Sequence, residues 1–167
     1  MIEAPKPDNE DQRLQALRSL LILDTPPEER FDRIVAFAAQ EFDTKMALVS
    51  MVDADRQWFK ARVGMKDSET PRSIAFCSHA ILQDTPLVVS DASLDPRFSG
   101  NPLVTGDDHM RFYAGAPLTL PTGEKVGTLC LIDEKPGEMD AVGLAILQSL
   151  RDLVIEELVR RQQGGQA

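Results

Sequence analysis

The sequence contains few of the residue types that most often carry chemistry. Its 167 residues include two cysteines, two histidines, one tryptophan and one tyrosine. Two cysteines are too few for the disulfide framework of a small secreted domain, and both lie in apolar segments, so we expect two reduced and mostly buried thiols. A metal site needs three or four ligands of suitable reach, and so small a supply of histidine and cysteine argues against one.

Positive charge is scarce as well. The chain has 18 lysines and arginines against 27 aspartates and glutamates, which gives a formal net charge of -9. Nucleic acid and anionic membranes attract basic surfaces, and no run of lysine or arginine marks a basic patch in this sequence. We therefore expect neither nucleic acid nor a membrane among its partners.

Long hydrophobic runs are absent too. No stretch reaches the length of a transmembrane helix, and the polar N-terminus lacks the apolar core of a signal peptide, which favours a cytoplasmic location. The remaining composition, 43% hydrophobic and 27% charged, suits one globular domain with a genuine core. We assign residues 1–8 to a flexible lead-in, 9–161 to a single domain and 162–167 to a polar tail.

Apolar residues at helical spacing predict three longer helices. The first covers residues 9–23. The second covers residues 26–42, where Thr25 is expected as the N-cap and Glu28 completes a capping box. The third, residues 140–161, carries an apolar stripe wider than a coiled-coil seam, so it can cover a sheet and still offer an edge to a partner.

Segments rich in β-branched and other apolar residues predict an antiparallel sheet. Two hairpins are expected, over residues 46–63 and 111–133, with a short strand at 86–90 between them. The connections are a polar stretch at 64–72, a short helix at 74–83 and an irregular loop at 91–109. A loop of that length is more often functional than not. This order of helices and antiparallel hairpins indicates an α+β fold.

The last hairpin is unusual because small residues interrupt both of its strands. Gly115 and Gly127 lie among apolar residues, where a glycine weakens a strand. Their presence predicts a close approach by another backbone or by a bound molecule.

Six segments in register resemble the GAF domain family, in the subtype found in bacterial signalling proteins ahead of histidine kinase or diguanylate cyclase modules. They are LDTPPEERFD (23–32), DADRQWFK (53–60), AFCSHAI (75–81), DASLDPRF (91–98), NPLV (101–104) and the hairpin 111–133. Their order and spacing agree from about residue 12 to residue 160.

This resemblance implies a GAF/PAS-like fold. It has an antiparallel sheet of five or six strands, terminal helices on one face, and an irregular lid that encloses a ligand pocket on the other. It also implies a non-enzymatic sensory module in signal transduction, in a two-component or cyclic di-GMP pathway. Such a module binds a small molecule, forms a homodimer through its terminal helices, or does both, and a kinase or cyclase output domain lies in cis or in trans. We expect no cofactor and no metal, and the ligand is unknown.

The candidate ligand-binding residues lie in the segments expected to form the lid and its facing strand. They are Phe76, Cys77, His79, Asp91, Arg97, Phe98, Met110, Arg111, Phe112 and Tyr113. The aromatic and apolar members suit an organic ligand, but they can equally fill the space themselves. The charged members, with Asp95, either gate a pocket or form loop turns and a surface ion pair. The sole tryptophan, Trp58, is expected to pack in the core.

Other functions within the family fit less well. A free methionine sulfoxide reductase uses a cysteine pair, and Cys77 lies near one such position, but no cysteine occurs between Asp84 and Tyr113 where the others fall. Bilin binders place cysteine directly before histidine, whereas Ser78 separates Cys77 from His79. The motif of cyclic-nucleotide binders is absent. A purely structural dimerisation domain remains the other alternative, and we assign no catalytic residue.

Overall fold

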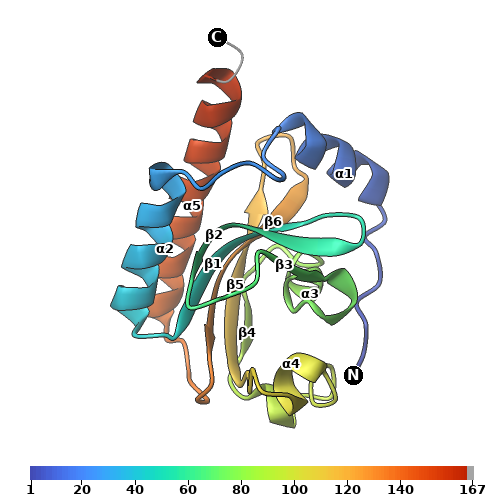
Figure 1. Cartoon of the computed structure of the whole chain (residues 1–167), viewed down its shortest axis with the longest axis vertical. Coiled ribbons are helices and arrows are strands. Elements are labelled where there is room, and N and C mark those ends of the chain that lie inside the picture. The colour runs from blue at the N-terminus through green and yellow to red at the C-terminus, as the bar shows by residue number, and fades with distance from the viewer. Residues whose placement is uncertain (165–167) are drawn as a thin grey trace.

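The computed structural model describes residues 1–164, and its centre is one six-stranded antiparallel sheet in the order β3-β2-β1-β6-β5-β4 (Figure 1). The strands are β1 (Met46–Val52), β2 (Arg56–Val63), β3 (Glu69–Pro71), β4 (Leu87–Val89), β5 (Phe112–Thr119) and β6 (Lys125–Asp133). Both expected hairpins and the short strand between them are confirmed. The short strand β3 was missed, because its segment reads as a polar connector.

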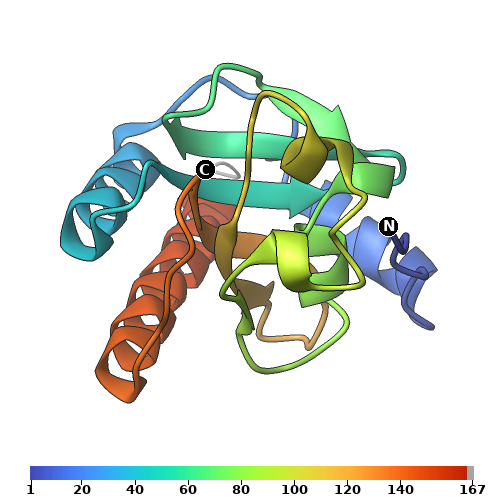
Figure 2. The ribbon, with the colours of Figure 1, turned by 90° about the horizontal axis from the view of Figure 1, so that it is seen from below.

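Helices cover both faces of this sheet. They are α1 (Glu10–Ser19), α2 (Glu29–Phe42), α3 (Cys77–Ala80), α4 (Pro102–Thr105) and α5 (Ala141–Gly164), with the 3-10 turns η1 (Arg72–Ile74) and η2 (Ala92–Leu94). α2 and α5 lie side by side on one face, and the short helices and turns lie on the other (Figure 2). We call residues 72–82 and 91–110 on that second face the lid.

The alternation of side chains along each strand creates two separate cores. In β1, Val49 and Met51 point toward α2 and α5, whereas Leu48 and Val52 point toward the lid. The sheet is therefore buried on both faces, which explains why its central strands are apolar almost throughout. Trp58 packs in the helix-side core, as expected.

A bulge in β2 attaches the sheet to the loop before α2. Val49 pairs with Ala61 and Ser50 pairs with Phe59, so Lys60 has no partner residue in β1. The buried Lys60 ammonium donates to the Thr25 hydroxyl at 2.8 Å and to the Pro26 carbonyl at 2.6 Å. It also pairs with a Glu28 carboxylate oxygen at 2.6 Å.

These contacts explain why the predicted capping box is wrong. α2 begins at Glu29, and neither Thr25 nor Glu28 caps it through a side chain. The Thr25 hydroxyl donates instead to the Ile22 carbonyl, and the Glu28 carboxylate pairs with Lys60, so neither side chain binds the free amides at the start of α2. A tertiary contact from the sheet thus overrides a local sequence pattern.

Several predicted boundaries also move. α1 ends at Ser19 rather than at residue 23, because Leu21 adopts a left-handed conformation with φ 52°. The helix expected at 74–83 shrinks to one turn at Cys77–Ala80. α5 continues to Gly164, so part of the expected polar tail is helical, and the rest lies outside the described residues.

α1 is anchored at one end of the sheet by buried charge. The fully buried Arg13 donates through Nη1 to the Val52 carbonyl at 2.6 Å and through Nε to Glu10 at 2.8 Å. Glu10 also pairs with Arg72 at the start of the lid. Within residues 1–164, no helix combines the length and apolar character needed to cross a bilayer.

Candidate functional site

Aromatic side chains fill the space between the lid and the sheet. Phe76 stacks on Phe98 with ring centroids 4.1 Å apart, and its ring lies 5.3 Å from that of Tyr113. Met110 is buried in the same core. These four predicted pocket residues therefore share one core, and their side chains occupy the interior.

The unusual glycine in β5 accommodates one of these rings. A Cβ atom added to Gly115 would lie 2.1 Å from the Tyr113 hydroxyl oxygen, so the tyrosine lies directly over the glycine. In β6, a Cβ atom on Gly127 would lie 1.9 Å from the Ser50 carbonyl oxygen of β1. Both glycines thus permit a close approach within the chain itself. Gly115 makes room for the Tyr113 side chain, and Gly127 makes room for the backbone of β1.

A buried polar cluster lies beside Tyr113, centred on the Cys77 sulfur. The hydroxyls of Ser50 and Tyr113 donate to it from 3.1 and 3.2 Å, and the Thr128 hydroxyl oxygen lies 3.0 Å away. The sulfur of Cys130 is 3.9 Å from it, and both cysteines are free and buried, as expected.

The environment shifts the acidities in this cluster. Burial raises the pKa of Cys77, but hydrogen bonds with Cys130, Ser50, Thr128 and Tyr113 outweigh burial and lower that pKa to about 7. The hydrogen bond with Cys77 and burial raise the pKa of Cys130. Burial also raises the pKa of Tyr113, which stays a neutral hydrogen-bond donor.

Two members of this cluster were not predicted from the sequence, whereas Cys130 was expected as a buried thiol. Ser50 and Thr128 interrupt two strands whose other residues are mostly apolar, and they pair directly with each other across β1 and β6. A polar residue in an otherwise apolar, doubly buried strand was the available signal, because a buried hydroxyl needs a partner.

The acidic residues of the lid stabilise its turns. The Asp91 carboxylate accepts from the Ser93 backbone at 3.0 Å, and its hydrogen bonds with Ser93 lower the pKa of Asp91. Asp95 accepts from the Arg97 backbone at 2.9 Å and pairs with the Arg97 guanidinium at 2.7 Å. Hydrogen bonds with Arg97 lower the pKa of Asp95. These contacts are the loop turns and the surface ion pair of the first alternative, and a gating role stays a prediction.

Two further predicted residues hold the lid in place. Arg111 donates through Nη1 to the carbonyls of Val104 and Met110, each at 2.9 Å. His79 donates through Nε2 to the Ile2 carbonyl at 2.9 Å, and burial lowers the pKa of His79. The Ile2 amide in turn donates to the Arg97 carbonyl, so the expected lead-in lies along the lid (Figure 1).

One predicted pocket residue, Phe112, lies on the helix side of the sheet and not on the lid side. Phe112 lies in the core between the sheet and α2 and α5, because neighbouring residues of a strand point to opposite faces and Tyr113 takes the lid side. The other nine predicted residues lie in or around the lid. Their role in ligand binding stays a prediction.

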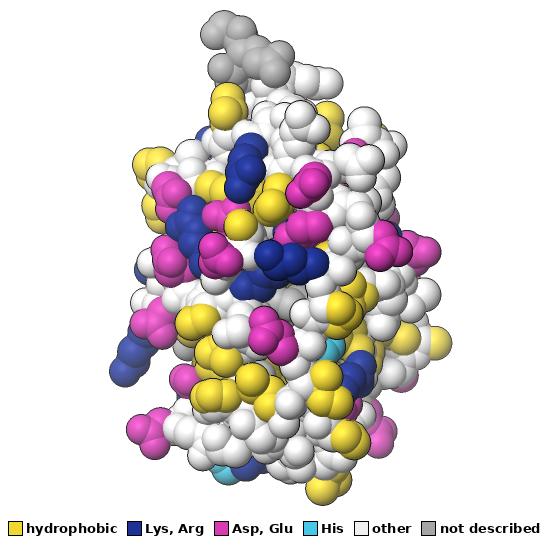
Figure 3. Space-filling view, turned by 90° about the vertical axis from the view of Figure 1, so that its right-hand side faces the viewer, with side chains coloured by type: hydrophobic (Ala, Val, Ile, Leu, Met, Phe, Trp, Pro, Cys, Tyr) yellow, Lys and Arg dark blue, Asp and Glu magenta, His cyan; other side chains and the backbone are white. Residues whose placement is uncertain are grey.

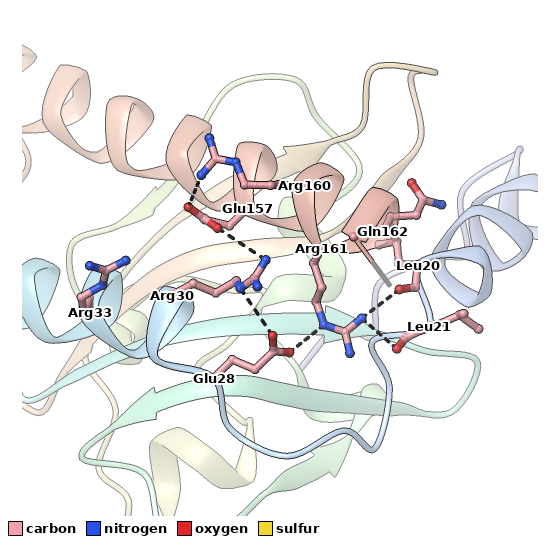
Figure 4. Close-up of a pocket in the computed structure, with 10 residues that line it drawn as sticks. Leu20, Leu21, Glu28, Arg30, Arg33, Glu157, Arg160, Arg161 and Gln162 are labelled. Atoms are coloured by element: carbon pink, nitrogen blue, oxygen red, sulfur yellow. Dashed lines mark hydrogen bonds and ion pairs between the residues drawn. The ribbon is translucent and has the colours of Figure 1, made fainter. Parts of the chain in front are cut away.

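An open groove lies at the far end of the helix face. It has a volume of about 790 Å³ and runs between the start of α2 and the end of α5 (Figure 4). Glu28 accepts from Arg161 at 2.6 Å, and Arg30 lies between Glu28 and Glu157. Arg161 also donates to the Leu20 and Leu21 carbonyls. These pairs attach α5 to α2 and to the loop before it.

A second hollow of about 450 Å³ is almost entirely apolar and lies on α5 itself. It is lined by Ala141, Val142, Ala145, Ile146, Ser149, Leu150 and Leu153. Val142 and Leu153 are 67% and 46% exposed, which is unusual for large apolar residues on one helix face.

The opposite side of the molecule carries a mixed surface. There acidic and basic side chains are interspersed with hydrophobic ones (Figure 3). Within residues 1–164, no group of three or more histidine, cysteine, aspartate or glutamate side chains is arranged to hold a metal ion.

The family model of the GAF domain matches residues 26–158, and the chain belongs to this family. Over 159 residues it is 40% identical to a cyclic di-GMP phosphodiesterase of Pseudomonas aeruginosa. The match covers 95% of this chain but 27% of the relative, so the chain corresponds to about a quarter of that protein.

Solved structures share the fold at low identity. The GAF domain of a phosphoenolpyruvate-protein phosphotransferase from Coxiella burnetii superposes with a TM-score of 0.66 at 16% identity, covering 95% of this chain and 99% of that one. A free methionine-R-sulfoxide reductase from Neisseria meningitidis gives 0.66 at 15% identity, covering 98% of each chain. The α+β fold with its six-stranded antiparallel sheet is thus the GAF fold.

Proposed function

We propose that this chain is a non-enzymatic regulatory module that acts as a homodimer in a cyclic di-GMP signalling protein. The apolar stripe along α5 carries this proposal, because exposed apolar surface of this kind marks an interaction site. The relative from Pseudomonas aeruginosa supports the pathway, because it is a cyclic di-GMP phosphodiesterase. The match covers 27% of that protein, so the rest of it lies outside the part that resembles this chain.

The stripe suits a second copy of the same helix. Ala141, Ala145 and Ser149 recur every four residues and leave room for a close helix, while Val142 and Leu153 provide protruding apolar side chains. A two-fold pairing of α5 with its copy would bury the same patch on both subunits. At 1.5 Å per residue the stripe, from Ala141 to Leu153, spans about 18 Å, or about three turns of α5.

The filled interior favours dimerisation over the binding of a large ligand. Phe76, Phe98 and Tyr113 occupy the space where a guest would lie, so a ligand must first displace them. A reductase function has less support, because Cys77 and Cys130 are 2% and 0% exposed and a substrate as large as a free amino acid has no path to them.

Sedimentation equilibrium tests the dimer. We expect the unchanged chain to be a dimer and Leu153→Glu to be a monomer, since a carboxylate cannot be buried in an apolar interface without a partner. Leu94→Glu is the matched control, because Leu94 is 81% exposed but lies in the lid, and it should leave the dimer intact. A monomeric unchanged chain, or a Leu153→Glu dimer of equal strength, would contradict the proposal.

A metabolite screen by thermal shift tests the ligand arm separately. A ligand that raises the melting temperature of the unchanged chain, and of Leu153→Glu equally, would show binding independent of the dimer. No response to any metabolite would leave dimerisation as the function of the module.

A further inference from the structure

The two cysteines of this chain meet at the boundary between the lid and the sheet. Cys77 belongs to α3 in the lid, Cys130 belongs to the central strand β6, and their sulfur atoms are 3.9 Å apart. A disulfide requires about 2.05 Å between the sulfurs. α3 is a single helical turn between irregular segments, so a small movement of the lid can bring Cys77 to Cys130.

The surroundings of the two sulfurs differ. Three hydroxyls, from Ser50, Tyr113 and Thr128, lie within 3.2 Å of Cys77. Hydrogen bonds donated to sulfur stabilise its thiolate, which is the reactive form. Cys130 lies in the sheet beneath it. The cluster therefore has the two parts of a redox pair, an activated thiol and a second thiol within reach.

We propose that Cys77 and Cys130 form a reversible disulfide in response to small hydroperoxides. The Cys77 sulfur attacks the peroxide, the O–O bond breaks, and Cys77 becomes a sulfenic acid while water or an alcohol leaves. The Cys130 thiol then attacks the sulfenic sulfur, the S–S bond forms, and a second water leaves. Two electrons pass from the thiol pair to the peroxide, and a cellular dithiol reverses the step.

The burial of the pair selects the oxidant by size. Cys77 is buried in the same core as the stacked rings of Phe76 and Phe98, and the hydrogen bond from His79 to the Ile2 carbonyl fastens α3 to the N-terminal segment. Hydrogen peroxide is close to water in size and reaches the thiols during brief openings of the lid, whereas an aromatic disulfide reagent is excluded. The disulfide would bond the lid to the sheet, and its use as a signal rests on the proposed regulatory function.

The experiment exposes the reduced, folded chain to hydrogen peroxide, removes the peroxide, and then unfolds the chain in denaturant at neutral pH with an excess of an alkylating reagent. We expect an intact mass lower by two hydrogen atoms, no alkylation, and a linked peptide that contains Cys77 and Cys130. In Cys130→Ser, dimedone added as the chain is unfolded should label Cys77 as a sulfenic acid. In Cys77→Ser, Cys130 should stay reduced. An aromatic disulfide should react with neither thiol of the native chain.

Several results would contradict the proposed disulfide between Cys77 and Cys130. Both cysteines could stay open to alkylation under conditions that oxidise the unfolded chain completely, the linkage could join two chains, or Cys77→Ser could oxidise as fast as the unchanged protein. If a variant fails to fold, the linked peptide in the unchanged chain decides. Sedimentation separates the two proposals. A dimer that gives no linked peptide contradicts only the disulfide proposal, and a monomer that gives the linked peptide contradicts only the dimer proposal.

Discussion

At the scale of single residues, the contact of Tyr113 with Gly115 decides how the interior is filled. Gly115→Ala places a Cβ atom where the tyrosine ring lies, so the ring or the strand must shift. We expect a loss of about 1–3 kcal/mol in the free energy of unfolding, measured with urea. Gly164→Ala is the control, since its added Cβ meets nothing within 4 Å, and its effect should be small. Equal effects of the two changes would contradict the prediction.

The charge cluster at the start of α1 predicts a specific response to acid. Burial raises the pKa of Glu10, but hydrogen bonds with Arg72 and Arg13 outweigh burial and lower that pKa to about 2. A carboxylate with a lowered pKa stabilises the fold above its ordinary value of 4.5, and this contribution is lost as the pH falls toward 2.

Glu10→Gln tests this response. The variant should be less stable than the unchanged chain near neutral pH, and the difference between their free energies of unfolding should shrink as the pH falls from about 4.5 toward 2. Urea unfolding at a series of pH values measures both. A difference that stays constant with pH would show that Glu10 contributes by packing and not by charge.

At the scale of elements, the junction between β2 and α2 depends on the pair between the buried Lys60 ammonium and the partly exposed Glu28. Glu28→Gln removes the carboxylate that contacts Lys60 and should cost up to about 3 kcal/mol of unfolding free energy. In Lys60→Met, Glu28 keeps its ion pair with Arg161, and the methionine fills a volume similar to that of the lysine. The cost of this change should therefore stay below about 1.5 kcal/mol. The reverse order of the two losses would contradict this account.

A substitution at the C-terminus of α2 should stabilise the protein. Asp43 has φ 50° and ψ 46°, a left-handed conformation that glycine adopts without strain. Asp43→Gly should raise the free energy of unfolding by about 0.5–1 kcal/mol, and Asp43→Ala should lower it. Thermal unfolding of both variants measures the sign, and a stabilising alanine would refute the argument.

The predictability of these elements depends on how local their causes are. Short runs of β-branched and other apolar residues were enough to predict the hairpins, because the strands are buried on both faces and their composition is distinctive. The capping box failed because Lys60, distant in sequence, binds Thr25 and Glu28. The filling of the interior was equally out of reach, since it depends on the side to which Tyr113 and Phe112 point.

At the scale of the whole molecule, the N-terminal segment acts as a strap on the lid. Ile2 bonds to both His79 and the Arg97 carbonyl. Removal of residues 1–4 should therefore increase amide hydrogen exchange across residues 92–105 and leave β1 and β6 protected. Exchange measured by mass spectrometry checks this, and unchanged exchange in the lid would show that the N-terminal segment does not stabilise it.

The sheet also limits how the molecule can associate. Its two outermost strands, β3 and β4, have three residues each, and the rest of β2 beyond β3 carries the Lys60 bulge and the charged Arg62. Short, interrupted and charged edges give an incoming strand little backbone to pair with. Growth by strand addition, the usual route to fibres, thus finds little support at either edge, which agrees with the proposed dimer through the helical face.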